Sequence, residues 1–178
     1  MLYMFGFQQI GVVVSDLYFV DPAPDEGQEG AERGVRLEVR LLEAGSADGS
    51  VYAARPISVD RPVWRADLLE TADGPPGSFD RTHHHPAFRG WEPGKRSFDP
   101  ALSAQPVAWL GEALADLPKL LDQAQLDPAS VGPDDARQLR DAVPEILDAV
   151  SRLLARVHAG ELATGPGDEV EAARLSWL

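Results

Sequence analysis

Cysteine is absent from this sequence of 178 residues, and its absence excludes several kinds of chemistry. The chain can form no disulfide, no cysteine-ligated zinc site, no iron–sulfur cluster and no thiol nucleophile. Long apolar runs are also missing, since no stretch approaches the roughly 20 residues that span a bilayer. The N-terminus has no basic segment followed by an apolar one, as a signal peptide would have. We therefore expect a cytoplasmic protein that does not enter a membrane.

Positive charge is scarce as well. The chain has 16 Lys and Arg against 29 Asp and Glu, which gives a net charge of -13 and a pI of about 4.6. Such a surface repels phosphate backbones on average, so we do not expect broad nucleic-acid binding. The exception is the segment 55–96, which contains seven basic and six acidic residues. This locally neutral to basic segment could accept an anionic ligand.

Several common catalytic motifs are also absent. The sequence contains no Gly-rich phosphate loop, no G-x-S-x-G nucleophile elbow and no paired-carboxylate helix motif. These absences favour the prediction that the chain is a small binding, regulatory or interaction module with a polar His/Arg site. An apolar N-terminal strand and a leucine-rich helical stripe suggest a homo-oligomer or a protein partner.

Apolar and charged residues alternate over 35–41, which predicts a strand with one dry face and one wet face. Further strands are predicted over 51–59 and 62–70, and over 1–20 as one long strand or two joined by a bend near Ser15 and Asp16. Residues 21–34 read as an exposed loop, and 77–100 as an irregular segment held by its aromatic residues. An antiparallel meander of four or five strands follows from this pattern.

The remaining chain is predicted to be helical. Pro106 suits a first helical turn, and Pro118 should kink or restart the helix that follows. The strongest amphipathic stripe covers 143–157 and ends where Gly160 can cap it. A short helix is expected within 164–178. The fold class is therefore α+β, with a β domain and its His/Trp loop in 1–100 and two to three helices in 101–178. These helices pack on the sheet or mediate association, in one compact unit.

Three of the four histidines are adjacent at positions 83–85. In an extended segment, an H-x-H pair presents both imidazoles to the same side and can bind one metal ion. We therefore consider a divalent metal held by His83, His85 and the carboxylate of Glu92, with Asp67 and Asp80 also within reach. The alternative is a cluster that only forms hydrogen bonds and packs against Trp91.

Gly77 is followed after five residues by His83 and His85. This spacing resembles the G-x5-H-x-H opening of the cupin metal motif. The resemblance implies a cupin-like metal-binding protein.

A different resemblance covers the segment from residue 51 to Pro86. Two strands followed by Phe79-Asp80 and then His84-His85-Pro86 resemble the layout of TumE-type toxins from bacterial toxin–antitoxin pairs. The resemblance implies action on RNA.

The same segment can be interpreted without any family as a nuclease or hydrolase site. His84 would transfer protons, because an imidazole titrates near neutral pH, while Arg81 and Arg89 would stabilise a charged transition state. Asp80 would orient the imidazole. The simpler interpretation is an Asp–Arg ion pair on a solvated loop.

A second group of polar residues lies on the strand predicted before the histidines. Arg61, Arg65 and Asp67 share one face of that strand, and Trp64 faces the core on the other side. These three residues either pair laterally or, together with Trp91, contact a ligand beneath the histidine segment.

Overall fold

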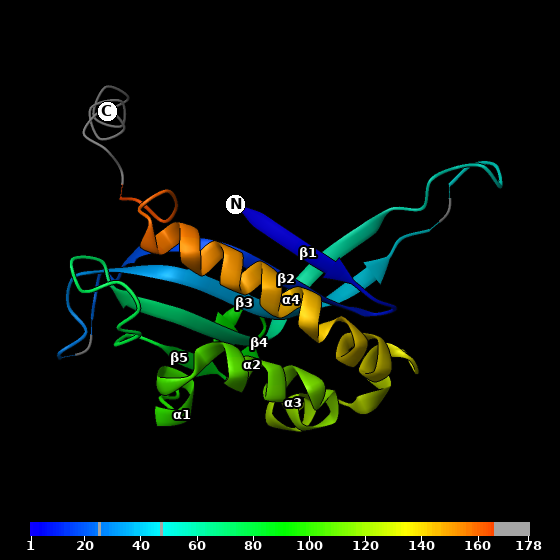
Figure 1. Cartoon of the computed structure of the whole chain (residues 1–178). Helices are drawn as coiled ribbons and strands as arrows, with labels where there is room; N and C mark the ends of the chain where they lie inside the picture. Colours follow the sequence, from blue (N-terminus) through cyan, green and yellow to red (C-terminus); the bar gives the residue numbers. More distant parts are fainter. Residues whose placement is uncertain (25, 47, 166–178) are drawn as a thin grey trace.

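A five-stranded antiparallel sheet forms the centre of the molecule (Figure 1). The computed structural model describes residues 1–24, 26–46 and 48–165. The strands lie side by side in chain order: β1 (Leu2–Gly6), β2 (Ile10–Val20), β3 (Ala31–Ala44), β4 (Ile57–Thr71) and β5 (His83–His85). Each strand pairs antiparallel with the next one along the chain. The predicted α+β class and antiparallel meander are confirmed.

Strand β4 corrects one detail of the predicted meander. The two strands expected at 51–59 and 62–70 form one continuous strand, and Val51 and Tyr52 lie exposed in the preceding turn. The pairing of β3 with β4 shifts register around Arg40, where Pro62 is its partner. A bulge at this point tolerates a proline inside a strand because the ladder is already interrupted there.

Strand β5 corrects the prediction that 77–100 is irregular throughout. His83–His85 pairs with β4 at the edge of the sheet, and His84 exchanges two backbone hydrogen bonds with Ser97, at 3.0 and 2.8 Å. The short strands β6 (Phe88–Arg89) and β7 (Glu92–Pro93) form a separate hairpin. Three residues are too few to show a strand periodicity, so only partners distant in sequence define β5.

The helices follow the sheet in the sequence. They are α1 (Pro100–Ala104), α2 (Pro106–Ala115), α3 (Leu117–Gln123), a 3-10 turn (Pro128–Ser130) and α4 (Asp135–His158). Pro106 and Pro118 lie in first helical turns as predicted, and Gly160 has the positive φ of 72° expected after a helix end. Most of the short helix predicted for 164–178 lies outside the described residues. No described helix is long and apolar enough to cross a membrane.

One face of the sheet packs against the helices. In Figure 1, α4 runs along β2 and β3, while α1–α3 lie beside β4 and β5. Alternate strand residues such as Val12, Leu37 and Trp64 are fully buried against helical residues such as Leu110 and Leu153. Burying one such side chain stabilises the fold by about 1.5–3 kcal/mol. The residues before and after position 100 therefore share one core.

The opposite face of the sheet is polar along β3 and β4. It carries Arg36, Glu38 and Arg40 on β3, beside Arg65 and Asp67 on β4. The predicted dry and wet faces of 35–41 are thus both present. The wet face contains the candidate site.

Candidate functional site

The pairing of β5 with β4 brings together polar residues from two strands. His83 lies opposite Asp67 and His85 opposite Arg65 in the antiparallel register. Residues two apart on a strand share a face, so both imidazoles lie on the polar face, as the H-x-H spacing predicts. His84 points to the opposite face, toward the helices.

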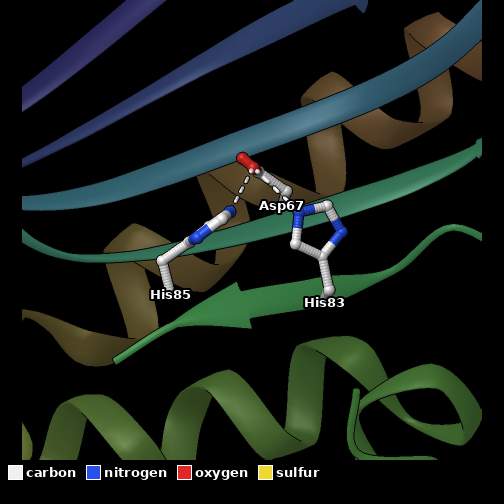
Figure 2. A group of neighbouring side chains, drawn as sticks. All are labelled: Asp67, His83 and His85. Atoms are coloured by element: carbon white, nitrogen blue, oxygen red, sulfur yellow. Dashed lines mark ion pairs between the residues drawn. The ribbon is translucent and has the colours of Figure 1, made fainter. Parts of the chain in front are cut away.

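Asp67, His83 and His85 converge on a common point (Figure 2). Oδ2 of Asp67 lies 3.5 Å from Nε2 of His83 and 3.8 Å from Nε2 of His85. One potential ligand atom from each of the three residues lies within 4.8 Å of the others, and all three residues are buried. This is the geometry of two imidazoles and one carboxylate facing the same small volume.

Backbone carbonyls determine which imidazole nitrogen carries the proton. Nδ1 of His83 lies 2.8 Å from the carbonyl of Arg81, and Nδ1 of His85 lies 2.7 Å from the carbonyl of Gly94. Because a carbonyl only accepts, each Nδ1 must donate, and Nε2 of the neutral ring keeps its lone pair. Burial lowers the pKa of both histidines, that of His85 to about 4. Two lone pairs therefore face the carboxylate of Asp67.

Arg65 supplies the positive charge that this group of acceptors requires. Its Nε lies 3.0 Å from Oδ2 of Asp67, and its terminal nitrogen lies 2.9 Å from Nε2 of His85. Arg36 binds the same carboxylate through two hydrogen bonds of 2.7 and 3.1 Å. Burial raises the pKa of Asp67, but Arg36 and Arg65 outweigh burial and hold it below its usual value. One buried carboxylate therefore forms ion pairs with two guanidinium groups.

The cluster opens into a pocket of about 410 Å³. Arg96 lies on its wall, 3.3 Å from Asp21 and 3.4 Å from Glu32. Burial raises the pKa of Glu32, whose Oε2 has no hydrogen-bond partner among the described residues. Among the described residues, three guanidinium groups and three carboxylates line the pocket, so their formal charges balance: Arg36, Arg65, Arg96, Asp21, Glu32 and Asp67.

Other residues singled out in the sequence lie away from this pocket. Glu92 is exposed on β7, and Asp67 rather than Glu92 approaches the two histidines. Trp91 is also exposed and stacks with Arg40, whose guanidinium lies 5.7 Å from the ring centre. Arg61, beside the bulge, and the exposed Arg89 are not among the residues that line the pocket.

Asp80 and Arg81 connect two loops. The carboxylate of Asp80 accepts hydrogen bonds from the backbone N–H of Thr71 and the hydroxyl of Ser78, at 3.0 and 2.7 Å. Arg81 lies 3.6 Å from Asp80 and donates to the carbonyls of Gly27 and Glu29. The structure thus separates both residues from His84, with which the nuclease hypothesis grouped them.

Asp80→Asn is expected to lower the melting temperature by a few degrees at pH 7. Burial raises the pKa of Asp80, but hydrogen bonds from Thr71 and Ser78 outweigh it, and the pKa is lowered. A lowered pKa contributes stability above the unfolded-state value of about 3.9, and this stability is lost as the pH falls through the folded-state value. Melting curves of both proteins should therefore converge below pH 4. A constant difference at every pH would contradict this assignment.

His84→Phe is expected to raise the free energy of unfolding by about 1 kcal/mol, because it removes a buried polar atom that lacks a partner. Nδ1 of His84 has no hydrogen-bond partner among the described residues. The centre of its ring lies 6.1 Å from the ring centre of Trp64 and 5.1 Å from that of Trp109. Urea denaturation of both proteins measures the change. A loss of stability would show that the imidazole has a polar role.

Several pocket residues were not singled out from the sequence. Arg36 appeared only as part of the strand alternation, and Asp21, Glu32 and Arg96 had no assigned role. These residues are far from the histidines in sequence or carry no motif. The pairing of β2 to β5 and the ion pairs of Arg96 with Asp21 and Glu32 bring them together.

Comparisons with known proteins found no match to this chain among family models, curated proteins or solved structures.

Proposed function

We propose that this chain is a protein that binds a divalent transition metal through His83, His85 and Asp67. The observation that carries the proposal is the convergence of two imidazole lone pairs and one carboxylate oxygen on the same point. Their separations of 3.5 and 3.8 Å are close to the spacing of about 3.4 Å between ligands of a tetrahedral ion with bonds of about 2.1 Å. Two histidines and a carboxylate suit Zn²⁺, Fe²⁺ and Co²⁺.

The hydrogen bonds that the proposed ligands form with other protein groups support this proposal. In metal sites a ligating histidine donates its other N–H to a carbonyl or carboxylate, which fixes the ring and its tautomer. His83 and His85 both do so, and the carboxylate of Asp67 is held by Arg36. The ligand set is therefore oriented by the fold before any ion enters.

Arg65 contacts two of the three proposed ligands. Its guanidinium lies against both Asp67 and His85, so metal binding requires it to leave these two residues. We propose that Arg65 is an internal cation that a metal ion displaces. Three protein ligands would leave coordination positions free, as in sites where a metal activates water or holds a small ligand.

A metal-free acid–base mechanism on a phosphodiester fits this geometry less well. Such a mechanism needs one group that holds a proton at neutral pH beside one that accepts it. Both Nδ1 protons are donated to carbonyls, so neither Nε2 carries a proton, and Nε2 of His85 already accepts from Arg65. His84 faces the helices. The proposal therefore combines two predictions from the sequence: a binding protein, and a divalent metal site at the H-x-H pair.

Calorimetric titration of untagged protein with Zn²⁺ and Co²⁺ tests the proposal. We expect the titration to give one ion per chain. The visible absorption spectrum of the protein with Co²⁺ should show the bands of a protein-bound ion. His83→Ala and His85→Ala should each weaken binding by about 100-fold or more, because each removes a ligand. His84→Phe is the matched control, since it changes the intervening histidine on the other face of the strand. Equal affinity in all four proteins would refute the proposed site.

Arg65→Met is expected to strengthen Zn²⁺ binding by about tenfold. The substitution removes a positive charge next to the ion and a competitor for Asp67 and His85, and each 1.4 kcal/mol corresponds to a factor of ten. Arg89→Met, which changes an exposed arginine outside the pocket, should leave the affinity unaltered. Weaker binding in Arg65→Met would contradict the role of Arg65 as a displaced cation.

A further inference from the structure

The pocket next to the three proposed ligands contains groups suited to an anion. We infer that the metal-loaded pocket binds a small oxyanion, the carboxylate or phosphate group of a small molecule, between the ion, Arg65 and Arg96. This inference rests on the proposed metal site and specifies the class of its ligand.

The charge of the pocket provides the first argument. In the part of the chain that the structure describes, three guanidinium groups and three carboxylates line it, so this set is formally neutral without a metal. A divalent ion bound by two neutral imidazoles and the existing Asp67 leaves the pocket with two uncompensated positive charges. Uncompensated charge in a partly buried site is costly, so an anion that enters with the ion is stabilised.

The displaced Arg65 provides the second argument. Its side chain is only 12% exposed; it forms an ion pair with Asp67 and a hydrogen bond with Nε2 of His85, which are two of the proposed metal ligands. A guanidinium that leaves these two residues while it remains in the pocket needs a new partner. A planar carboxylate or a phosphate matches its fork of N–H donors.

Arg96 provides a third contact on the pocket wall. Its Nη1 donates to Gln28 at 3.2 Å and to Glu32 at 3.4 Å, and its Nη2 donates to Asp21 at 3.3 Å, so neither carboxylate forms a bidentate pair with it. The side chain is 20% exposed and retains donors that can face the pocket. Two guanidinium groups from different segments can thus approach one anion.

The dimensions of the pocket restrict the ligand. A volume of about 410 Å³ lies at the lower end of the range for small-molecule sites. It has room for an ion and a small organic anion. The net charge of -13 disfavours an extended polyanion such as a nucleic-acid strand.

Titration of the Co²⁺-loaded and metal-free proteins with acetate and with methylphosphonate tests this inference. At least one of the two anions should bind about tenfold more tightly when Co²⁺ is present, and should shift the Co²⁺ absorption bands. Linkage then requires that the same anion tighten Co²⁺ binding by the same factor. The anion that shows this coupling distinguishes a carboxylate site from a phosphate site.

Arg96→Met should weaken binding of the coupled anion about tenfold, whereas Arg89→Met should not change it. If Co²⁺ binds but neither anion affects its spectrum or affinity, the inference is wrong and the metal site stands. Equal anion affinity with and without Co²⁺ would also overturn it. Failure of Co²⁺ itself to bind would overturn the proposed function instead.

Discussion

Asp67→Ala is expected to lower the free energy of unfolding by about 3–5 kcal/mol, the usual cost of removing one partner from a buried ion pair. Asp67 is 1% exposed and forms ion pairs with both Arg36 and Arg65. Without it, two largely buried guanidinium groups lose their common counter-charge, and the two neighbouring histidines cannot replace it. The same variant should lose metal binding.

Urea denaturation in the presence of a chelator measures this stability change without any contribution from a bound ion. Asp73→Ala is the matched control, because Asp73 is exposed and should change stability by less than about 0.5 kcal/mol. If Asp67→Ala unfolds at the same urea concentration as the control, Arg36 and Arg65 do not depend on this carboxylate. The structural basis of the site would then be wrong.

Asp135→Ala is the second substitution with a large expected effect, again about 3–5 kcal/mol. The carboxylate of Asp135 is completely buried and accepts backbone hydrogen bonds from Gln8, Gln9 and Gly132, at 2.7, 3.2 and 2.6 Å. Each buried N–H left without an acceptor costs about 1–3 kcal/mol. Asp135 also lies in the first turn of α4, where a negative charge is favourable.

Chemical denaturation of Asp135→Ala and of Asp141→Ala compares a buried with an exposed acidic residue of the same helix. Asp141 forms a surface ion pair with Arg137, at 3.4 Å, and such a pair contributes little. Equal stabilities would show that the turn between β1 and β2 is not held by α4. A large difference would establish Asp135 as the link between the first hairpin and the last helix.

Local patterns predicted the regular parts of the fold well. The alternation over 35–41, the prolines at helix starts and the stripe over 143–157 all correspond to observed elements, because each depends on neighbours within a few residues. The merging of two predicted strands into β4 and the pairing of β5 were missed. Both depend on contacts with residues far away in the sequence, such as Arg40 opposite Pro62 and His84 beside Ser97.

The candidate site was only partly visible in the sequence. The H-x-H spacing indicated that His83 and His85 share a face, and Asp67 was one of several carboxylates within reach. The choice of Asp67 over Glu92 depends on the register between β4 and β5, which no local pattern encodes. The contact of Arg65 with both Asp67 and His85 depends on the same register.

The sequence by itself determined the composition limits, the α+β class and the adjacency of the histidines, because these follow from residue types and short spacings. Only the tertiary structure decided which nitrogen of each imidazole faces the pocket, since the carbonyls of Arg81 and Gly94 make that choice. It also decided that Arg36, Arg65 and Arg96 line one pocket. Strand pairing brings these groups together, and strand pairing is a long-range property of the chain.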